Sequence, residues 1–325
     1  MQNLVVRKYE TEDHQIWNAF VADSKNGTFL LHRNFMDYHS DRFQDFSLLI
    51  FDDEKLISVL PAHLKEAVLY SHLGLTYGGL LLNYKSKLTD VIAILQSVLK
   101  FLDELQISSL FVKSIPSIYH KYPSDELKYA AFVAGAVVKR RDSLSVIDLR
   151  NPIKFTKSRL ESIRRGQKNG LIIAEDFNFE IFWNKVLIPN LKAKHQANPV
   201  HSLEEIIKLH QKFPENIRHF NVYLETEIVA GTTVFVSDQV AHPQYVSGLP
   251  NKNETGALDY LYSHLIKEVF ADKKFFDFGI SNEDRGMKLN EGLVFWKESF
   301  GGRTLTQDFY EIPTKNYLLL DSVIL

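Results

Sequence analysis

The second half of the chain alternates apolar runs and amphipathic stretches in an order typical of a mixed α/β fold. It opens with three apolar runs joined by very short connections, and runs joined in this way form antiparallel hairpins. An amphipathic helix with one apolar stripe follows, then a short buried strand, a second helix and a last strand. The predicted strands cover residues 220–225, 228–237, 240–248, 275–279 and 306–312, and the predicted helices cover residues 256–270, with Thr255 as N-cap, and 289–300.

The first half repeats this order without repeating the letters. A hairpin, a third extended run, a Gly-containing connection, a long helix and a short strand fill residues 46–113, as they fill residues 219–279. A weak repeat on this scale predicts two copies of one fold. Because a residue before proline is disfavoured in a helix, the Asn151–Pro152 bond marks the boundary, and we expect domains at residues 1–150 and 151–325. Within the first domain, the third extended run is expected at residues 67–73, the connection at 74–83, and helices at 88–105 and 119–130.

The composition of the 325 residues excludes several classes of function. There is no Cys, so disulfides, thiolate catalysis and Cys-ligated metal sites are excluded. A formal net charge of −2 argues against electrostatic wrapping of nucleic acid, and we expect no DNA partner. No spacing of His, Asp and Glu resembles a metal site. The first residues do not resemble a signal peptide and no apolar run is long enough to span a membrane, so we expect a cytoplasmic protein with no transmembrane segment.

A motif near the C-terminus carries a family resemblance. The triplet Asp277-Phe278-Gly279 ends a predicted strand, and Phe295-Trp296-Lys297-Glu298-Ser299-Phe300-Gly301 lies in the next helix. Together with the order of meander, helix and strand, this looks like the "DFG … FK-x-x-FG" signature of the FemAB-like proteins, a branch of the GNAT acyltransferases. The resemblance covers residues 150–312 and implies an α/β fold of tandem GNAT-like units packed side by side.

The same resemblance implies an activity. It suggests an N-acyltransferase that moves an acyl or aminoacyl group from acyl-CoA or aminoacyl-tRNA to an amine of a cell-envelope precursor or amino sugar. Either donor would be a co-substrate, with no permanently bound cofactor. The alternative is a non-catalytic GNAT-fold protein that binds a sugar nucleotide or a partner. The oligomeric state is not predicted.

The stretch where GNAT enzymes carry their coenzyme A loop departs from the family pattern. It reads Asn253-Glu254-Thr255-Gly256-Ala257 and keeps one glycine. Helix amides near Gly256 and Ala257 are still candidates for binding a phosphate of the co-substrate. FemAB-like proteins that use charged tRNA have a similarly degraded loop, so the departure favours that donor.

Candidate catalytic residues follow from the chemistry of acyl transfer. Orientation and a polarised carbonyl supply most of the rate, so cations and backbone donors are needed rather than a nucleophile triad. The resemblance places the motif lysine at Lys297, which would stabilise negative charge on a carbonyl oxygen or leaving phosphate; the alternative is a solvated lysine. Asp277 is a candidate general base or a loop cap. His195 is a candidate acceptor of the amine proton, or a partner of a helix dipole.

Candidate substrate-binding residues lie on three segments. Arg164 and Arg165 belong to a basic helix, and clustered arginines suit phosphate or carboxylate binding, although an exposed basic helix is the alternative. His242 and Tyr245 lie on the third meander strand, which faces substrate in GNAT folds, although core packing is the alternative for Tyr245. The remaining candidates are Gly279, where a ligand can approach the backbone closely, and Ser281.

Overall fold

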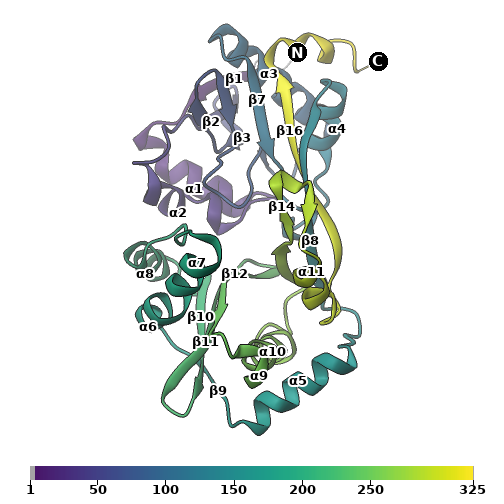
Figure 1. Ribbon diagram of the computed structural model, residues 1–325. Helices are drawn as coiled ribbons and strands as arrows, with labels where there is room; N and C mark the ends of the chain where they lie inside the picture. The colour runs from purple at the N-terminus through teal and green to yellow at the C-terminus, as the bar shows by residue number, and fades with distance from the viewer. Residues whose placement is uncertain (1–3, 325) are drawn as a thin grey trace. The chain divides into compact units, whose positions relative to one another are not determined.

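The computed structural model describes residues 4–324, apart from the side chains of His39 and His195, and it divides into two compact units (Figure 1). One unit contains the residues up to Asp142 and those from Thr306 onward, and the other contains Ser143–Leu305. The division therefore lies within two strands, β8 (Val137–Asp148) and β16 (Arg303–Pro313). The sequence, by contrast, predicts a single boundary after residue 150.

The sheet of the second unit begins with an antiparallel meander. It runs through β9 (Ile172–Glu175), β10 (Ile217–Leu224), β11 (Glu227–Val236) and β12 (Val240–Gly248). Strand β11 is buried from Ile228 to Val236, as expected for a central strand whose two faces are both covered. The three strands predicted between residues 220 and 248 are confirmed with small shifts at their ends.

A helical crossover links this meander to a parallel strand. Helix α10 (Ala257–His264) continues as a π-helical turn, Leu265–Val269, and leads to β13 (Phe275–Ile280), which pairs in parallel with β12. A parallel pair needs such a crossover. The apolar face of α10 packs on the sheet in a core that includes Phe220, Leu261, Leu265, Phe270, Phe276 and Phe300.

The remaining helices of the second unit surround this sheet. Helix α5 (Lys157–Lys168) lies alongside α10 (Figure 1). The segment before β10 forms α6 (Phe179–Phe182), a π-helical turn (Trp183–Leu187), α7 (Ile188–His195) and α8 (Leu203–Lys212). After β13 come the short strands β14 (Asn282–Glu283) and β15 (Lys288–Leu289), and α11 (Glu291–Glu298).

The first unit follows the same order. Its antiparallel strands are β1 (Leu4–Lys8), β2 (Leu48–Asp52), β3 (Lys55–Leu60) and β6 (Leu81–Leu82), with α1 (His14–Asp23) and α2 (Arg33–Met36) between β1 and β2. The long helix α3 (Leu88–Glu104) leads to β7 (Ser109–Lys113), and α4 (Glu126–Val133) follows. A hairpin of β4 (His63–Lys65) and β5 (Val68–Tyr70) is added beside β7.

Three predicted elements differ from the structure. The run at residues 67–73 contains β5 and is not the third meander strand. That strand is β6, which lies inside the predicted connection. It has only two residues, so it shows no alternation of apolar and polar positions that could be detected in the sequence. Helix α4 begins after Pro123 and Ser124 rather than at residue 119. Thr255 does not cap the crossover helix: it ends a short helix, α9 (Lys252–Thr255), and Gly256 turns the chain with φ 73° before α10.

Each unit receives one strand from the other half of the sequence. In the first unit β16 pairs antiparallel with β7, with Tyr310 opposite Val112. In the second unit β8 pairs antiparallel with β13, with Ile147 opposite Phe276. This exchange explains why the C-terminal residues belong to the first unit. Across residues 4–324, none of the helices combines the length and the apolar character needed to cross a lipid bilayer.

Candidate functional site

Strands β12 and β13 separate almost as soon as they pair. The ladder between them consists of Val240 with Phe275 and Ala241 with Phe276. The next residue on each strand is His242 on one and Asp277 on the other. Beyond them, among residues 4–324, β12 has no partner strand on that edge. Ligand crevices in α/β sheets commonly lie toward the carboxyl ends of parallel strands, which is the direction in which this gap opens.

His242 and Asp277 contact each other at this branch point. The Nδ1 atom of His242 lies 2.9 Å from the backbone oxygen of Asp277 and 3.4 Å from its Oδ2. Because a carbonyl oxygen only accepts hydrogen bonds, Nδ1 is the donor, and in the neutral tautomer with this arrangement Nε2 carries the lone pair. A Cβ on Gly279 would lie 3.0 Å from Cε1 of His242, so glycine lets the ring approach the backbone there.

Lys297 of α11 joins the same cluster. Its Nζ donates to the backbone oxygens of Gly279 at 2.9 Å and Ile280 at 2.6 Å, which fixes the end of β13. Burial lowers the pKa of Lys297 from 10.5 to about 8, and the nearby Asp277 carboxylate opposes that shift. The next residue, Ser281, is buried, and its Oγ has no hydrogen-bond partner among the described residues.

A cleft of about 340 Å³ opens farther along β12. Its walls come from α7, the end of β12, the α9–α10 junction and α11. This volume is in the range of small-molecule sites, about 300–1,000 Å³. The apolar lining is Leu187, Leu191, Val246, Leu258, Leu293 and Trp296, and the polar lining includes Asn190, Lys194, Ser247, Lys252, Asn253 and Asp259.

The one carboxylate in the cleft wall is already neutralised. Asp259 forms an ion pair with Arg159 of α5 and accepts a hydrogen bond from Nε1 of Trp296 at 2.8 Å. Arg159 is buried and also donates from Nε to the Oγ of Ser299 at 2.9 Å. Asp259 and Arg159 therefore brace α5, α10 and α11 against one another.

Several predicted site residues lie away from the branch point. Tyr245 is buried, and its hydroxyl accepts a hydrogen bond from the backbone N–H of His201 at 3.0 Å, so it belongs to the core. Arg165 donates to the backbone oxygen of Asn253 at 2.8 Å, and Arg164 is exposed. His195 is the last residue of α7, and its side chain lies outside the described residues.

Gly256 and Ala257 serve the packing of two helices. A Cβ on Gly256 would lie 2.4 Å from the backbone oxygen of Ser162 in α5, and Ala257 is fully buried. The structure thus brings His242, Asp277, Gly279 and Lys297 together. The lining lysines Lys194 and Lys252 were not among the sequence candidates, because they lie on separate helices and carry no motif.

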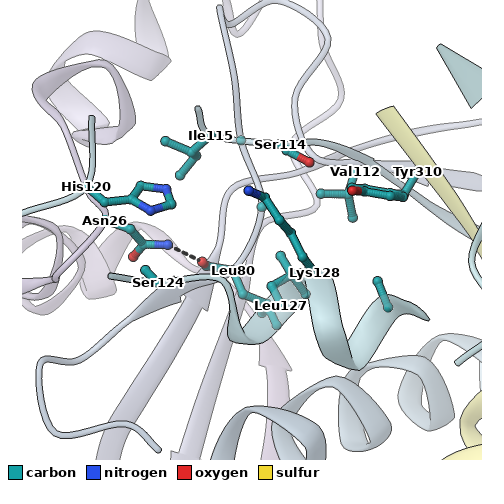
Figure 2. Close-up of a pocket in the computed structure, with 13 residues that line it drawn as sticks. Asn26, Leu80, Val112, Ser114, Ile115, His120, Ser124, Leu127, Lys128 and Tyr310 are labelled. Carbon is teal, nitrogen blue, oxygen red and sulfur yellow. Dashed lines mark hydrogen bonds between the residues drawn. The ribbon is translucent and has the colours of Figure 1, made fainter. Parts of the chain in front are cut away.

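The first unit has a much smaller pocket, between the segment that precedes β6 and the end of β7. Figure 2 shows Asn26, His120 and Lys128 converging on it from different segments. Asn26 donates to the backbone oxygen of Leu80 at 2.9 Å, and burial lowers the pKa of His120 to about 4, so the ring is neutral. Its volume of about 30 Å³ has room for only a water molecule or two. Of these two places, only the cleft of the second unit has the volume of a small-molecule site.

Comparisons with known proteins identify the fold. No family model and no curated protein matches the sequence. Among solved structures, the chain is similar to FemX with 10% identity and a TM-score of 0.66, covering 95% of this chain and 97% of that one. It is similar to the C-terminal domain of an Agrobacterium fabrum protein described as a lysylphosphatidylglycerol synthetase, with 11% identity, a TM-score of 0.61 and 95% of both chains covered.

A third structure, L-PGS from Bacillus licheniformis, has 12% identity and a TM-score of 0.59, covering 97% of this chain and 96% of that one. At such identities the likeness establishes the fold, and these matches span nearly the whole chain. The recurrence of strand and helix order in the two units agrees with it. The chain therefore has the tandem GNAT-like α/β fold of the FemAB-like proteins.

Proposed function

We propose that the second unit is an N-acyltransferase that moves an acyl or aminoacyl group from acyl-CoA or aminoacyl-tRNA to an amine. The observation that carries the proposal is the branch point of β12 and β13, where His242 and Asp277 contact each other on the strand that leads into the cleft. A donor in the cleft and an acceptor at the branch point would meet at an imidazole with a free lone pair.

The chemistry that these residues can perform is amine acylation. The neutral acceptor amine attacks the carbonyl carbon of the donor, a C–N bond forms, and the bond to the donor's sulfur or oxygen breaks. His242 Nε2 takes the proton that the amine loses and returns it to the leaving thiolate or alkoxide. General base catalysis of this kind contributes about 10²–10⁴-fold in rate.

Asp277 and Lys297 act as positioning residues in this scheme. Asp277 holds the His242 ring through its backbone oxygen and carboxylate. Lys297 holds the strand end that carries Gly279 and Ile280, with two of its three N–H groups occupied. The sequence motif predicts that Lys297 stabilises negative charge on a carbonyl oxygen or leaving phosphate, but the lining of the cleft contains Leu293 and Trp296 of the same helix and not Lys297.

For the acceptor we propose the amine of a cell-envelope precursor or amino sugar. Support comes from the fold neighbours, one of which is described as the C-terminal domain of a lysylphosphatidylglycerol synthetase. The alternative is a non-catalytic protein that binds a sugar nucleotide. The observation that favours the alternative is that the Lys297 ammonium is bound to two backbone carbonyls.

The test is a mass-spectrometric assay for acyl transfer. The full chain is offered acetyl-CoA or charged tRNA together with amine-bearing envelope precursors and amino sugars. We expect transfer from one of the donors, and a loss of about 10²-fold or more in kcat for His242→Asn. The control is His264→Asn at the end of α10, a part-exposed histidine that does not line the cleft. Transfer from neither donor, with binding of a sugar nucleotide, would support the alternative, and an unchanged kcat in His242→Asn would remove His242 from the mechanism.

A further inference from the structure

Two lysines face the cleft from different helices of the second unit. Lys194 is exposed near the end of α7, and Lys252 is part-buried at the start of α9. The stem of Lys252 packs on the backbone of Gly248, where Cβ and Cδ of the lysine lie 3.1 Å from the position of an added Cβ. Gly248 therefore leaves room for this lysine beside the end of β12.

The two lysines line the same cleft, and their charges act on each other. Burial and the neighbouring Lys194 ammonium lower the pKa of Lys252. Among the described residues no carboxylate forms an ion pair with either lysine, and Asp259, the carboxylate of the cleft wall, is held by Arg159 and Trp296. Two adjacent cations without an anion repel each other, and that repulsion is relieved when an anion binds between them.

The helix amides at this place are badly arranged for a phosphate loop. Residues 252–255 form α9, and Gly256 is pressed against α5. The exposed Glu254 of α9 would also repel an anion bound at these amides. Side-chain ammonium groups are the remaining strong anion donors that line the cleft.

We propose that Lys194 and Lys252 form an anion subsite that binds a phosphate group of the acyl donor at the mouth of the cleft. The inference rests on the proposed function, because it names the part of the donor that anchors it. The subsite differs from a backbone phosphate loop because two side chains from separate helices supply the charge. Coenzyme A and the 3′ end of a charged tRNA share the required phosphate chemistry.

The distance to the branch point limits the donor further. Gly248, on which the stem of Lys252 packs, is six residues beyond His242 on β12, which at about 3.3 Å per residue is roughly 17–20 Å with the bulge near Gln244. A donor anchored by its phosphate at the lysines must therefore carry its carbonyl on an arm of about this length. Phosphate compounds without such an arm, such as inorganic pyrophosphate, would bind and not react.

The test uses the full chain and three probes in titration calorimetry: inorganic pyrophosphate, coenzyme A, and a short single-stranded RNA with the 3′-terminal sequence of tRNA. The variants are Lys194→Gln and Lys252→Gln. The matched control is Lys192→Gln, an exposed lysine on α7 that does not line the cleft. Circular dichroism and thermal unfolding check that all variants are folded.

We expect at least one probe to bind and its affinity to fall about tenfold in each cleft variant, with no change in Lys192→Gln. The affinity of the unmodified chain should fall with added salt, and less steeply in Lys252→Gln. Binding of coenzyme A without RNA identifies a thioester donor, and the reverse identifies a charged tRNA. Failure of all three probes to bind, or equal affinity in Lys252→Gln and Lys192→Gln, overturns the subsite. Acyl transfer that persists in those circumstances would leave the proposed function in place.

Discussion

Replacing Lys297 with Met should change how the stability of the second unit depends on pH. The ordinary pKa of 10.5 falls to about 8 in the folded protein because the ammonium is buried. This difference in pKa corresponds to a free-energy cost of roughly 3 kcal/mol for holding the charged form of the lysine in the folded protein at neutral pH. Between the two pKa values the unfolded chain binds the proton and the folded chain does not, so stability rises with pH across that window. From about pH 7.5 to about pH 9.5 the gain is roughly 2 kcal/mol.

Methionine has no titrating group, so Lys297→Met should lose this gain. At neutral pH two effects oppose each other: the buried charge disappears, but the oxygens of Gly279 and Ile280 lose their donor, at about 1–3 kcal/mol for each buried group. The net change in stability is therefore small, whereas acyl transfer falls because the end of β13 is released.

The assay is urea unfolding at the two pH values, followed by tryptophan fluorescence, because Trp183 and Trp296 both lie in the second unit. The control is Lys288→Met, which removes an exposed lysine on β15 of the same unit. The reasoning would be refuted if Lys297→Met retained the full pH-dependent gain of the unmodified chain, since the lysine would then not be the buried group.

Two other predictions concern the fold that supports the site. Burial lowers the pKa of His219 to about 4, so stability is lost as pH falls from about 6.5 toward 4. Between about pH 7 and pH 5 the loss should be about 2 kcal/mol. Urea unfolding at the two pH values should show that this loss is nearly absent in His219→Gln. Gly256→Ala should cost about 2–4 kcal/mol of stability, because the residue has φ 73° and its Cβ would clash with Ser162. Gly170 has φ 70° but open space around it, so Gly170→Ala should cost only about 1 kcal/mol. Equal losses of stability for the two variants in thermal unfolding would contradict the packing argument.

The order of elements could be predicted from the sequence because it depends on local patterns. Apolar alternation and short connections identified the meander of β10, β11 and β12, and the repeat of that order identified a tandem fold. The motif residues also gave a useful prediction of the cluster: Asp277, Gly279 and Lys297 lie together, since a strand end and the helix that follows it are close in the chain as well as in space.

The face on which a side chain lies was harder to predict. The pairing of β11 with β12 shifts between Thr233 and Val234, so the strict alternation of faces is interrupted between His242 and Tyr245. One extra residue in a strand is invisible in a hydrophobic pattern. The face of Tyr245 relative to His242 therefore cannot be counted from the sequence, and the structure buries Tyr245 against His201 and Trp183.

The sequence by itself was enough to specify two similar α/β units, to exclude cysteine chemistry, and to bring Asp277, Gly279 and Lys297 together as a candidate site at the end of β13, because these properties depend on composition or on neighbours in the chain. Folding alone decided the rest. The exchange of β8 and β16, the cleft, and the pairing of Lys194 with Lys252 all join segments far apart in sequence, and their proximity depends on packing that no local pattern encodes.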